Sequence, residues 1–105
     1  MYKLCFFVPK SHLESVKDAL FEQGAGQLGD YERCAWQVLG QGQFLPLAGS
    51  NPFLGEVGNN NAVDEYRVET VVADELINDV LSCLADVHPY QQPAYEYWQI
   101  NPSLN

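Results

Sequence analysis

The stretch from His88 to Tyr95, which reads HPYQQPAY, constrains the fold of this chain more than any other. Each of its two prolines fixes its own φ angle and excludes the preceding residue from the helical region. The segment before it, 74–87, carries apolar residues at helical spacing, and the segment after it, 94–100, alternates as a strand does. The stretch therefore predicts a helix that ends near Val87 or His88, a turn, and a final strand.

The rest of the chain indicates three more strands and one more helix. The run from Tyr2 to Val8 is apolar on both alternating sets, which is typical of a central strand covered on both faces. Ser11 and Glu14 have the spacing of a capping box, which predicts a helix over about 12–23 that Gly24 ends. Two further strands are expected over 31–39 and 63–72.

This order of elements predicts an α+β fold of the ferredoxin-like βαββαβ type, in one domain over 1–105. Two helices would cover one face of a four-stranded antiparallel sheet and leave the other face open. Several strands are apolar on both sets, for example Trp98 and Ile100 opposite Tyr95 and Tyr97. We therefore expect the open face to be covered, most simply by further copies of the chain.

The connection over 40–62, between the second and third strands, is much longer than a hairpin needs. Its first part, 44–54, has apolar residues that can pack on the body, whereas 58–61 has none and is expected to be mobile. A role in binding or assembly and a passive excursion both stay open. The glycine-rich segment 24–30 follows a helix and leads into a strand, which predicts a helix C-cap rather than a phosphate-binding loop.

The net charge of −9, with only five lysines and arginines, argues against a nucleic-acid partner and against an anionic membrane surface. The first apolar run is interrupted by Pro9-Lys10 too early for a signal peptide or a spanning helix, so we expect a cytoplasmic protein. Three widely spaced cysteines predict buried thiols rather than disulfides or a zinc ribbon.

Four groups of residues resemble a known family: Tyr31 to Trp36, Gly42 to Gly55, Glu65 to Glu69, and His88-Pro89-Tyr90 with Pro93-Ala94-Tyr95. They are similar to the PII- and CutA-like domain inserted in YqfO-type members of the YbgI (Nif-three-like) family. The resemblance covers essentially the whole chain. It implies a ferredoxin-like fold, trimer-like association through sheet faces, and a long loop between the second and third strands that meets ligands or partners.

Two departures from the family pattern limit what the resemblance implies. The usual acidic pair after His-Pro-Tyr is Gln91-Gln92 here, which puts any role for carboxylates at those positions in doubt. The dinuclear metal site of the larger family belongs to flanking domains. We therefore expect the insert domain standing alone, without that hydrolase or metal-centre activity.

The leading hypothesis is a non-enzymatic, self-associating module that senses a small ligand or a protein partner through the 40–62 loop and the 88–95 turn. We expect a homo-oligomer, with a trimer favoured, and no cofactor. Arg33 and Arg67 are the strand cations able to meet an anion, although a salt bridge to Glu32, Glu65 or Glu69 is the alternative. The candidate ligand-binding residues are Arg33, Trp36, Gly49, Ser50, Asn51, Arg67, His88 and Tyr90.

The alternative hypothesis is a CutA-like protein that binds a divalent metal through His88 and either Cys34 or His12. Imidazole and thiolate ligands suit copper or zinc, but no pair has helical or zinc-knuckle spacing, so folding or assembly would have to build the site. His88 as a helix C-cap donor is the competing interpretation. An enzyme is not expected, because two histidines and dispersed carboxylates define no catalytic constellation.

Overall fold

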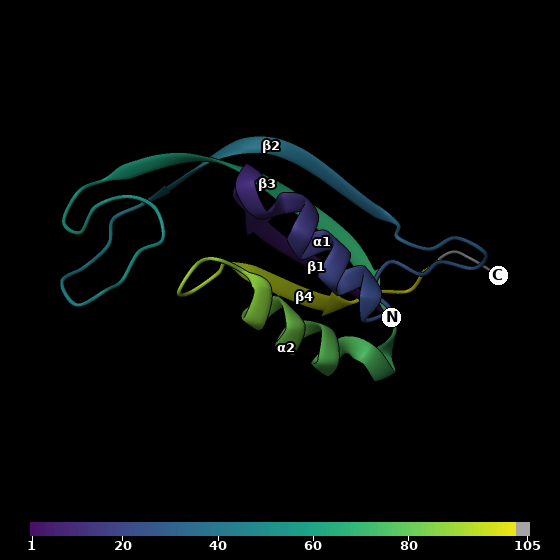
Figure 1. The fold of residues 1–105 in the computed structure, drawn as a ribbon. Helices are drawn as coiled ribbons and strands as arrows, with labels where there is room; N and C mark the ends of the chain where they lie inside the picture. Colours follow the sequence, from purple (N-terminus) through teal and green to yellow (C-terminus); the bar gives the residue numbers. More distant parts are fainter. Residues whose placement is uncertain (103–105) are drawn as a thin grey trace.

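The computed structural model describes residues 1–102, which form four strands and two helices in the predicted order (Figure 1). All strand pairs are antiparallel, and their order across the sheet is β2-β3-β1-β4. The prediction of an α+β, ferredoxin-like fold is confirmed. The elements are β1 (Tyr2–Val8), η1 (Lys10–His12), α1 (Leu13–Glu22), β2 (Ala35–Phe44), β3 (Asn61–Val72), η2 (Asp74–Leu76), α2 (Ile77–Val87) and β4 (Tyr95–Gln99).

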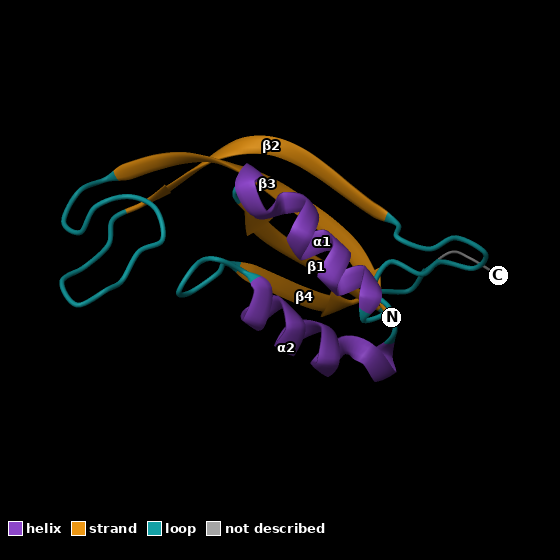
Figure 2. Ribbon diagram, in the orientation of Figure 1, coloured by secondary structure: helices purple, strands orange, loops and turns teal. Residues whose placement is uncertain are grey.

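The core lies between the sheet and the two helices, which cover the same face (Figure 2). Strand β1 is central, as predicted, because Leu4 and Phe6 pack under the helices and Cys5, on the opposite face, is equally buried. Burying each such aliphatic or aromatic side chain contributes roughly 1.5–3 kcal/mol. In the described chain, no helix has the length and apolarity needed to span a bilayer.

Helix α1 is not opened by the predicted capping box. The turn η1 precedes it, so His12 occupies the N-cap position and makes no side-chain cap hydrogen bond. Ser11 Oγ lies 2.8 Å from His12 Nδ1, and Glu14 forms an ion pair with Lys17. Ser11 lies within the 3-10 turn, one residue too early to cap the helix, and this explains why the prediction was wrong.

Strand β2 begins four residues later than the predicted 31–39 and extends five residues further, through Gly40 and Gly42 to Phe44. Leu28 and Tyr31 close a tight turn, and Arg33 adopts a positive φ of 57°, which no strand residue adopts. Regular pairing starts only at Ala35, which lies opposite Thr70 of β3. The glycine-rich segment itself is a helix C-cap and connection, as predicted: Gly24 and Gly26 both have positive φ angles.

Strands β2 and β3 continue beyond β1 as a two-stranded arm. Strand β1 ends at Val8, opposite Tyr66, whereas β2 and β3 pair as far as Phe44 and Asn61. The true loop is therefore 45–60, shorter than the predicted 40–62, and it curls back toward the α2–β4 turn (Figure 1). Residues 58–61 have no apolar side chain, but they do form hydrogen bonds. Asn61 Nδ2 donates to Asn59 O, and the Gly58 amide donates to Pro46 O.

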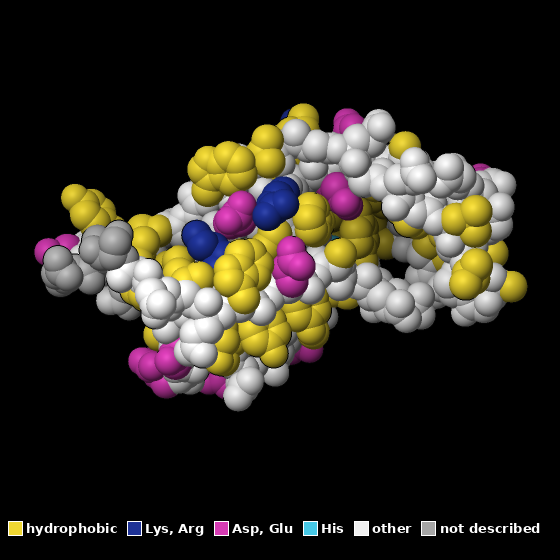
Figure 3. All heavy atoms as spheres, turned by 180° about the vertical axis from the view of Figure 1, so that it is seen from behind, with side chains coloured by type: hydrophobic (Ala, Val, Ile, Leu, Met, Phe, Trp, Pro, Cys, Tyr) yellow, Lys and Arg dark blue, Asp and Glu magenta, His cyan; other side chains and the backbone are white. Residues whose placement is uncertain are grey.

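The face of the sheet that the helices leave open carries a mixture of apolar and charged side chains (Figure 3). Trp36, Val38 and Trp98 are respectively 59%, 44% and 41% exposed, which is high for large apolar residues. Arg67 and Glu69, both on β3, lie between them and form an ion pair of 3.4 Å. The open face therefore combines exposed apolar side chains on both edge strands with an ion pair on β3.

Candidate ligand-binding site

The turn between α2 and β4 is fixed to the sheet by His88, which ends α2 as its C-cap residue. The His88 side chain is buried, with Nε2 2.6 Å from the carbonyl oxygen of Phe7 on β1. Its Nδ1 accepts a hydrogen bond of 3.1 Å from the Tyr90 amide. Because Nδ1 accepts, Nε2 must carry the proton and donate to Phe7. Burial lowers the pKa of His88, which favours this neutral form.

Tyr90 connects this turn to the arm. Its phenol donates a hydrogen bond of 3.1 Å to Oε2 of Glu65 on β3. Burial, together with the neighbouring Glu65 carboxylate, raises the pKa of Tyr90 well above its ordinary value. Tyr90 therefore remains a neutral donor, and Glu65 keeps its second oxygen, Oε1, for another partner.

The 45–60 loop is docked on the same turn. The Asn51 amide donates to Gln91 Oε1 at 3.0 Å. The Phe53 ring packs edge-on against His12 at 5.4 Å and lies 6.3 Å from the ring of Tyr90. One hydrogen bond from a backbone N–H of the loop to the Gln91 side chain and two aromatic contacts thus hold the loop against the body.

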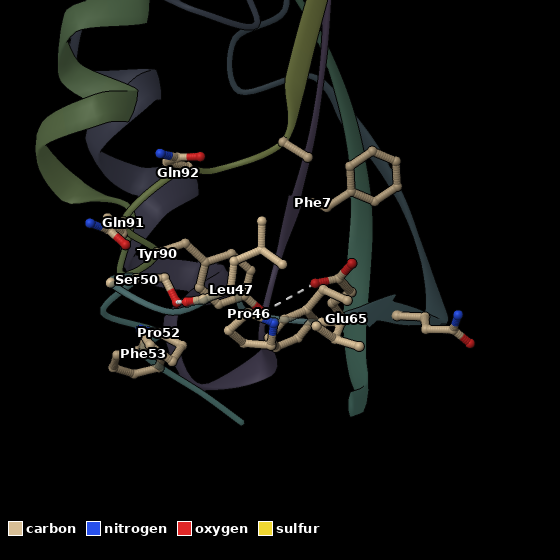
Figure 4. Close-up of a pocket in the computed structure, with 15 residues that line it drawn as sticks. Phe7, Pro46, Leu47, Ser50, Pro52, Phe53, Glu65, Tyr90, Gln91 and Gln92 are labelled. Atoms are coloured by element: carbon tan, nitrogen blue, oxygen red, sulfur yellow. Dashed lines mark hydrogen bonds between the residues drawn. The ribbon is translucent and has the colours of Figure 1, made fainter. Parts of the chain in front are cut away.

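A pocket of about 640 Å³ lies between the loop, the arm and the turn. Figure 3 shows it as a gap between the body and the loop, and Figure 4 shows side chains from all three segments lining it. This volume is within the range of small-molecule sites. The lining residues are Phe7, Gln43, Phe44, Leu45, Pro46, Leu47, Gly49, Ser50, Pro52, Phe53, Glu65, Tyr90, Gln91, Gln92 and Ala94.

The structure brings some of the predicted ligand-binding residues together at this pocket. Gly49, Ser50 and Tyr90 line it directly. Asn51 fixes the adjoining loop by its hydrogen bond to Gln91, and His88 fixes Tyr90 by accepting a hydrogen bond from the Tyr90 amide. The predicted location between the loop and the His88 turn therefore coincides with a real cavity.

The other predicted residues lie elsewhere. Arg33 pairs with Asp18 and Glu22 of α1, rather than with the acidic residues expected from the sequence. Trp36 projects from the open face of the sheet. Arg67 pairs with Glu69, as one expected alternative had it, and its guanidinium lies 6.0 Å from the centre of the Phe7 ring.

The candidate metal ligands are not gathered in one place. His12 contacts Phe53 of the loop and is close enough to His88 to contribute to the lowering of its pKa. Cys34 lies elsewhere, in the connection between α1 and β2, where its amide is bonded to Gly26 and its carbonyl accepts from Thr70. Both ring nitrogens of His88 already have backbone partners, so a metal would have to displace one of them. Within residues 1–102 no three His, Cys, Asp or Glu side chains form a cluster that could hold a metal ion.

Sequence reasoning missed Glu65 as a pocket residue and named it only as an ion-pair partner. It also missed Phe7, Phe53 and Gln91. Glu65 belongs to the same outward-facing set of β3 as Glu69, and nothing in the alternation distinguishes the two residues. Its position beyond the end of β1 could have been suspected only from the difference in length between the strands.

Comparison with known proteins gives a close sequence match to part of a larger protein. No family model matches the chain. The GTP cyclohydrolase 1 type 2 homolog of Halalkalibacterium halodurans is 39% identical over 100 residues, which cover 95% of this chain and 27% of the relative. The chain thus spans about a quarter of the length of the curated relatives it matches.

Solved structures give the same result. A Bacillus cereus protein related to NIF3 superposes with a TM-score of 0.82 at 33% identity, over 96% of this chain and 26% of that one. CutA from Archaeoglobus fulgidus superposes with a TM-score of 0.70 at 17% identity, over 99% of this chain and 88% of that one. The second likeness shows a shared fold.

The order and antiparallel pairing of the elements give the chain the α+β, ferredoxin-like fold that is also found in CutA and PII-like proteins. The sequence matches are more specific than this shared fold. The chain is similar in sequence to a segment that makes up about a quarter of the proteins named GTP cyclohydrolase 1 type 2 homologs, and to the corresponding part of a protein related to NIF3. The resemblance inferred from the sequence is confirmed.

Proposed function

We propose that this domain is a non-enzymatic binding module that takes a small ligand in the pocket between the 45–60 loop and the 88–92 turn. The observation that carries the proposal is the pocket itself, about 640 Å³ in volume and lined by segments far apart in the sequence, among them the loop and the turn. Ligand contacts to both segments would stabilise the docked loop relative to an undocked one. Binding would thereby be coupled to the position of the loop, as a sensing role requires.

The chemistry of the pocket supports binding more than catalysis. Tyr90 is a neutral phenol with a raised pKa, and one oxygen of Glu65 is occupied by it. The remaining lining side chains are hydrocarbons, amides and one hydroxyl, which orient ligands but exchange no protons near neutral pH. A protein partner, the other binding mode expected from the sequence, would insert a side chain into the same pocket.

To test the proposal, small cations, anions and neutral compounds are added to the isotope-labelled domain, and the amide chemical shifts are measured by NMR. We expect at least one compound to shift the amide signals of Ser50, Phe53 and Gln91 together, because these residues line one cavity. Shifts confined to other parts of the chain, or none with any compound, would contradict a ligand-binding role for this pocket.

We also propose that the domain self-associates through the open face of its sheet, with a trimer favoured. The support is the exposure of Trp36, Val38 and Trp98 on one face. Burying such apolar surface between copies stabilises the assembly by roughly 25 cal/mol for each Å² removed from water.

Sedimentation of the wild type and of Trp36→Glu tests this association. We expect an oligomer for the wild type and a smaller species for the variant, because a carboxylate cannot be buried there without a partner. Tyr31→Glu is the matched control, since Tyr31 is an exposed aromatic residue in the turn before β2 and should not affect assembly. A monomeric wild type would overturn the proposal.

Divalent-metal binding stays a prediction. His88 and Cys34 lie in different parts of one chain, so a shared site would need donors from a second copy. Native mass spectrometry with and without a chelator checks it, because a bound metal appears as a chelator-sensitive increase in mass.

A further inference from the structure

The pocket carries a single formal charge. Of its 15 lining residues, all within the described part of the chain, Glu65 is the one acidic residue, and none is a lysine, arginine or histidine. No lysine or arginine of residues 1–102 forms an ion pair with it. Arg67 lies beside the ring of Phe7 and is paired with Glu69. The formal charge that the lining itself contributes is therefore that of one half-buried carboxylate.

That carboxylate is oriented and only partly satisfied. Oε2 accepts the hydrogen bond from the Tyr90 phenol, whereas Oε1 has no hydrogen-bond partner among the described residues. Tyr90 is held in turn by His88, which is bonded to both β1 and the Tyr90 amide. Oε1 is thus an acceptor without a partner, and it lies over Gly42 of β2, where an added Cβ would clash with it.

The walls around Glu65 are aromatic and aliphatic. Phe7, Phe44, Phe53 and Tyr90 contribute rings, and two prolines and two leucines contribute aliphatic surface. Aromatic faces attract organic cations, and apolar walls bind the hydrocarbon part of a ligand. An anion would meet repulsion from Glu65 and from a protein of net charge −9.

Resting on the proposed binding function of this pocket, we infer that its ligand is a small organic cation, an ammonium group carried on an apolar ring or chain. The ammonium donates to Glu65 Oε1, and the rings surround the hydrocarbon part. The amides of Gln43 and Gln92 and the hydroxyl of Ser50 are available to further polar groups of the ligand. Gln91 is less available, because its Oε1 already accepts from Asn51.

Three probes of nearly equal size separate charge from shape: 2-phenylethylamine, 2-phenylethanol and 3-phenylpropionate. In amide NMR titrations of the wild type we expect the amine to bind with a Kd on the order of 1 mM or tighter, with shifts at Ser50 and Gln91. We expect the alcohol and the carboxylate to bind at least about tenfold more weakly.

Two variants assign the effect to Glu65. Glu65→Gln keeps an acceptor for Tyr90 and nearly the same shape, and we expect it to weaken amine binding by roughly tenfold. Tyr90→Phe keeps the charge and frees Oε2, so we expect amine binding to be retained or tightened. Unchanged amine binding in Glu65→Gln would overturn the inference, and so would loss of binding in a folded Tyr90→Phe.

The outcomes also separate this inference from the proposed function. Equal or tighter pocket binding by the alcohol or the carboxylate overturns the cation inference but leaves a ligand-binding pocket. No binding of the amine to the wild type at concentrations on the order of 10 mM overturns the cation inference. The ligand-binding function fails with it only if the mixed compound set also produces no shifts at the pocket.

Discussion

Gly42 lies beside the carboxylate of Glu65 so closely that a Cβ at position 42 would be 2.6 Å from Glu65 Cδ. The two residues are diagonal neighbours, because Glu65 pairs with Gly40 in the β2–β3 register. The Glu65 side chain can lie flat across β2 only because that strand has no side chain at Gly42. This glycine thus positions the carboxylate for its hydrogen bond with Tyr90.

The first prediction is that Gly42→Ala displaces Glu65 and breaks its bond to Tyr90. Gly40→Ala is the matched control, since a Cβ there meets nothing within 4 Å and neither glycine has a positive φ. Losing a partly buried charge-assisted hydrogen bond should make Gly42→Ala less stable than Gly40→Ala by about 1 kcal/mol in urea unfolding. Equal stabilities for the two variants would show that Glu65 moves without cost.

The second prediction concerns pH. Burial lowers the folded-state pKa of His88 from 6.5, so below about pH 6.5 the unfolded chain binds a proton more readily than the folded one. The contribution of His88 to stability is therefore complete above that value and is lost as the pH falls through its folded-state pKa. Protonation at Nδ1 would also break the bond from the Tyr90 amide.

Urea unfolding of the wild type at about pH 7.5 and about pH 5.5 measures this effect, in a window where carboxylates contribute less. His88→Gln does not titrate there, so we expect a smaller loss of stability between the two pH values than in the wild type. Each protein is compared with itself, which removes the cost of the substitution. An equal loss in both proteins would assign the pH dependence to other groups.

Much of the fold could be predicted because local signals and tertiary structure agree. The two prolines after Val87 end α2 where the sequence indicated, and the doubly apolar run Tyr2–Val8 is the central strand. Strand β2 was misplaced because its limits are set by its partner. Ala35 is the first residue with a partner on β3, and Gly40 to Phe44 stay extended because 61–65 pair with them.

The candidate site was predicted in part for a similar reason. The loop and the His-Pro-Tyr turn are visible as motifs, so Ser50 and Tyr90 could be named. Glu65 could not, because its role depends on where β1 stops and on a glycine of another strand. Arg33 was expected to meet an anion, but its position depends on a turn whose geometry the sequence does not reveal.

The third prediction tests the connection between α1 and β2. Gly26 has a φ of +85°, and a Cβ there would lie 2.8 Å from the Cys34 backbone nitrogen, which is bonded to the Gly26 carbonyl. Gly26→Ala therefore combines backbone strain with a clash against a rigid neighbour, and should cost about 2 kcal/mol or more. Gly29→Ala, with positive φ but nothing within 4 Å, isolates the strain, and we expect about 1 kcal/mol. Similar losses in calorimetry for both variants would mean that the clash relaxes.

The fourth prediction is that Arg33 contributes neither to the pocket nor much to stability. It lies in the segment before β2, at the end of the molecule opposite the 45–60 loop (Figure 1), and pairs with Asp18 and Glu22 at 3.1 and 2.8 Å. These ion pairs are largely exposed, so Arg33→Gln should change the free energy of unfolding by less than about 1 kcal/mol and leave amine binding unchanged.

Arg33→Gly sharpens the test, because Arg33 has a φ of +57° that glycine adopts without strain. Both variants lose the same two ion pairs, so their difference reports the backbone alone. We expect Arg33→Gly to be more stable than Arg33→Gln by roughly 0.5–1 kcal/mol in urea unfolding. If Arg33→Gln instead abolished the shifts of Ser50 and Gln91 on adding amine, the guanidinium would be coupled to the pocket, and the assignment of the ligand site to the loop and turn alone would be wrong.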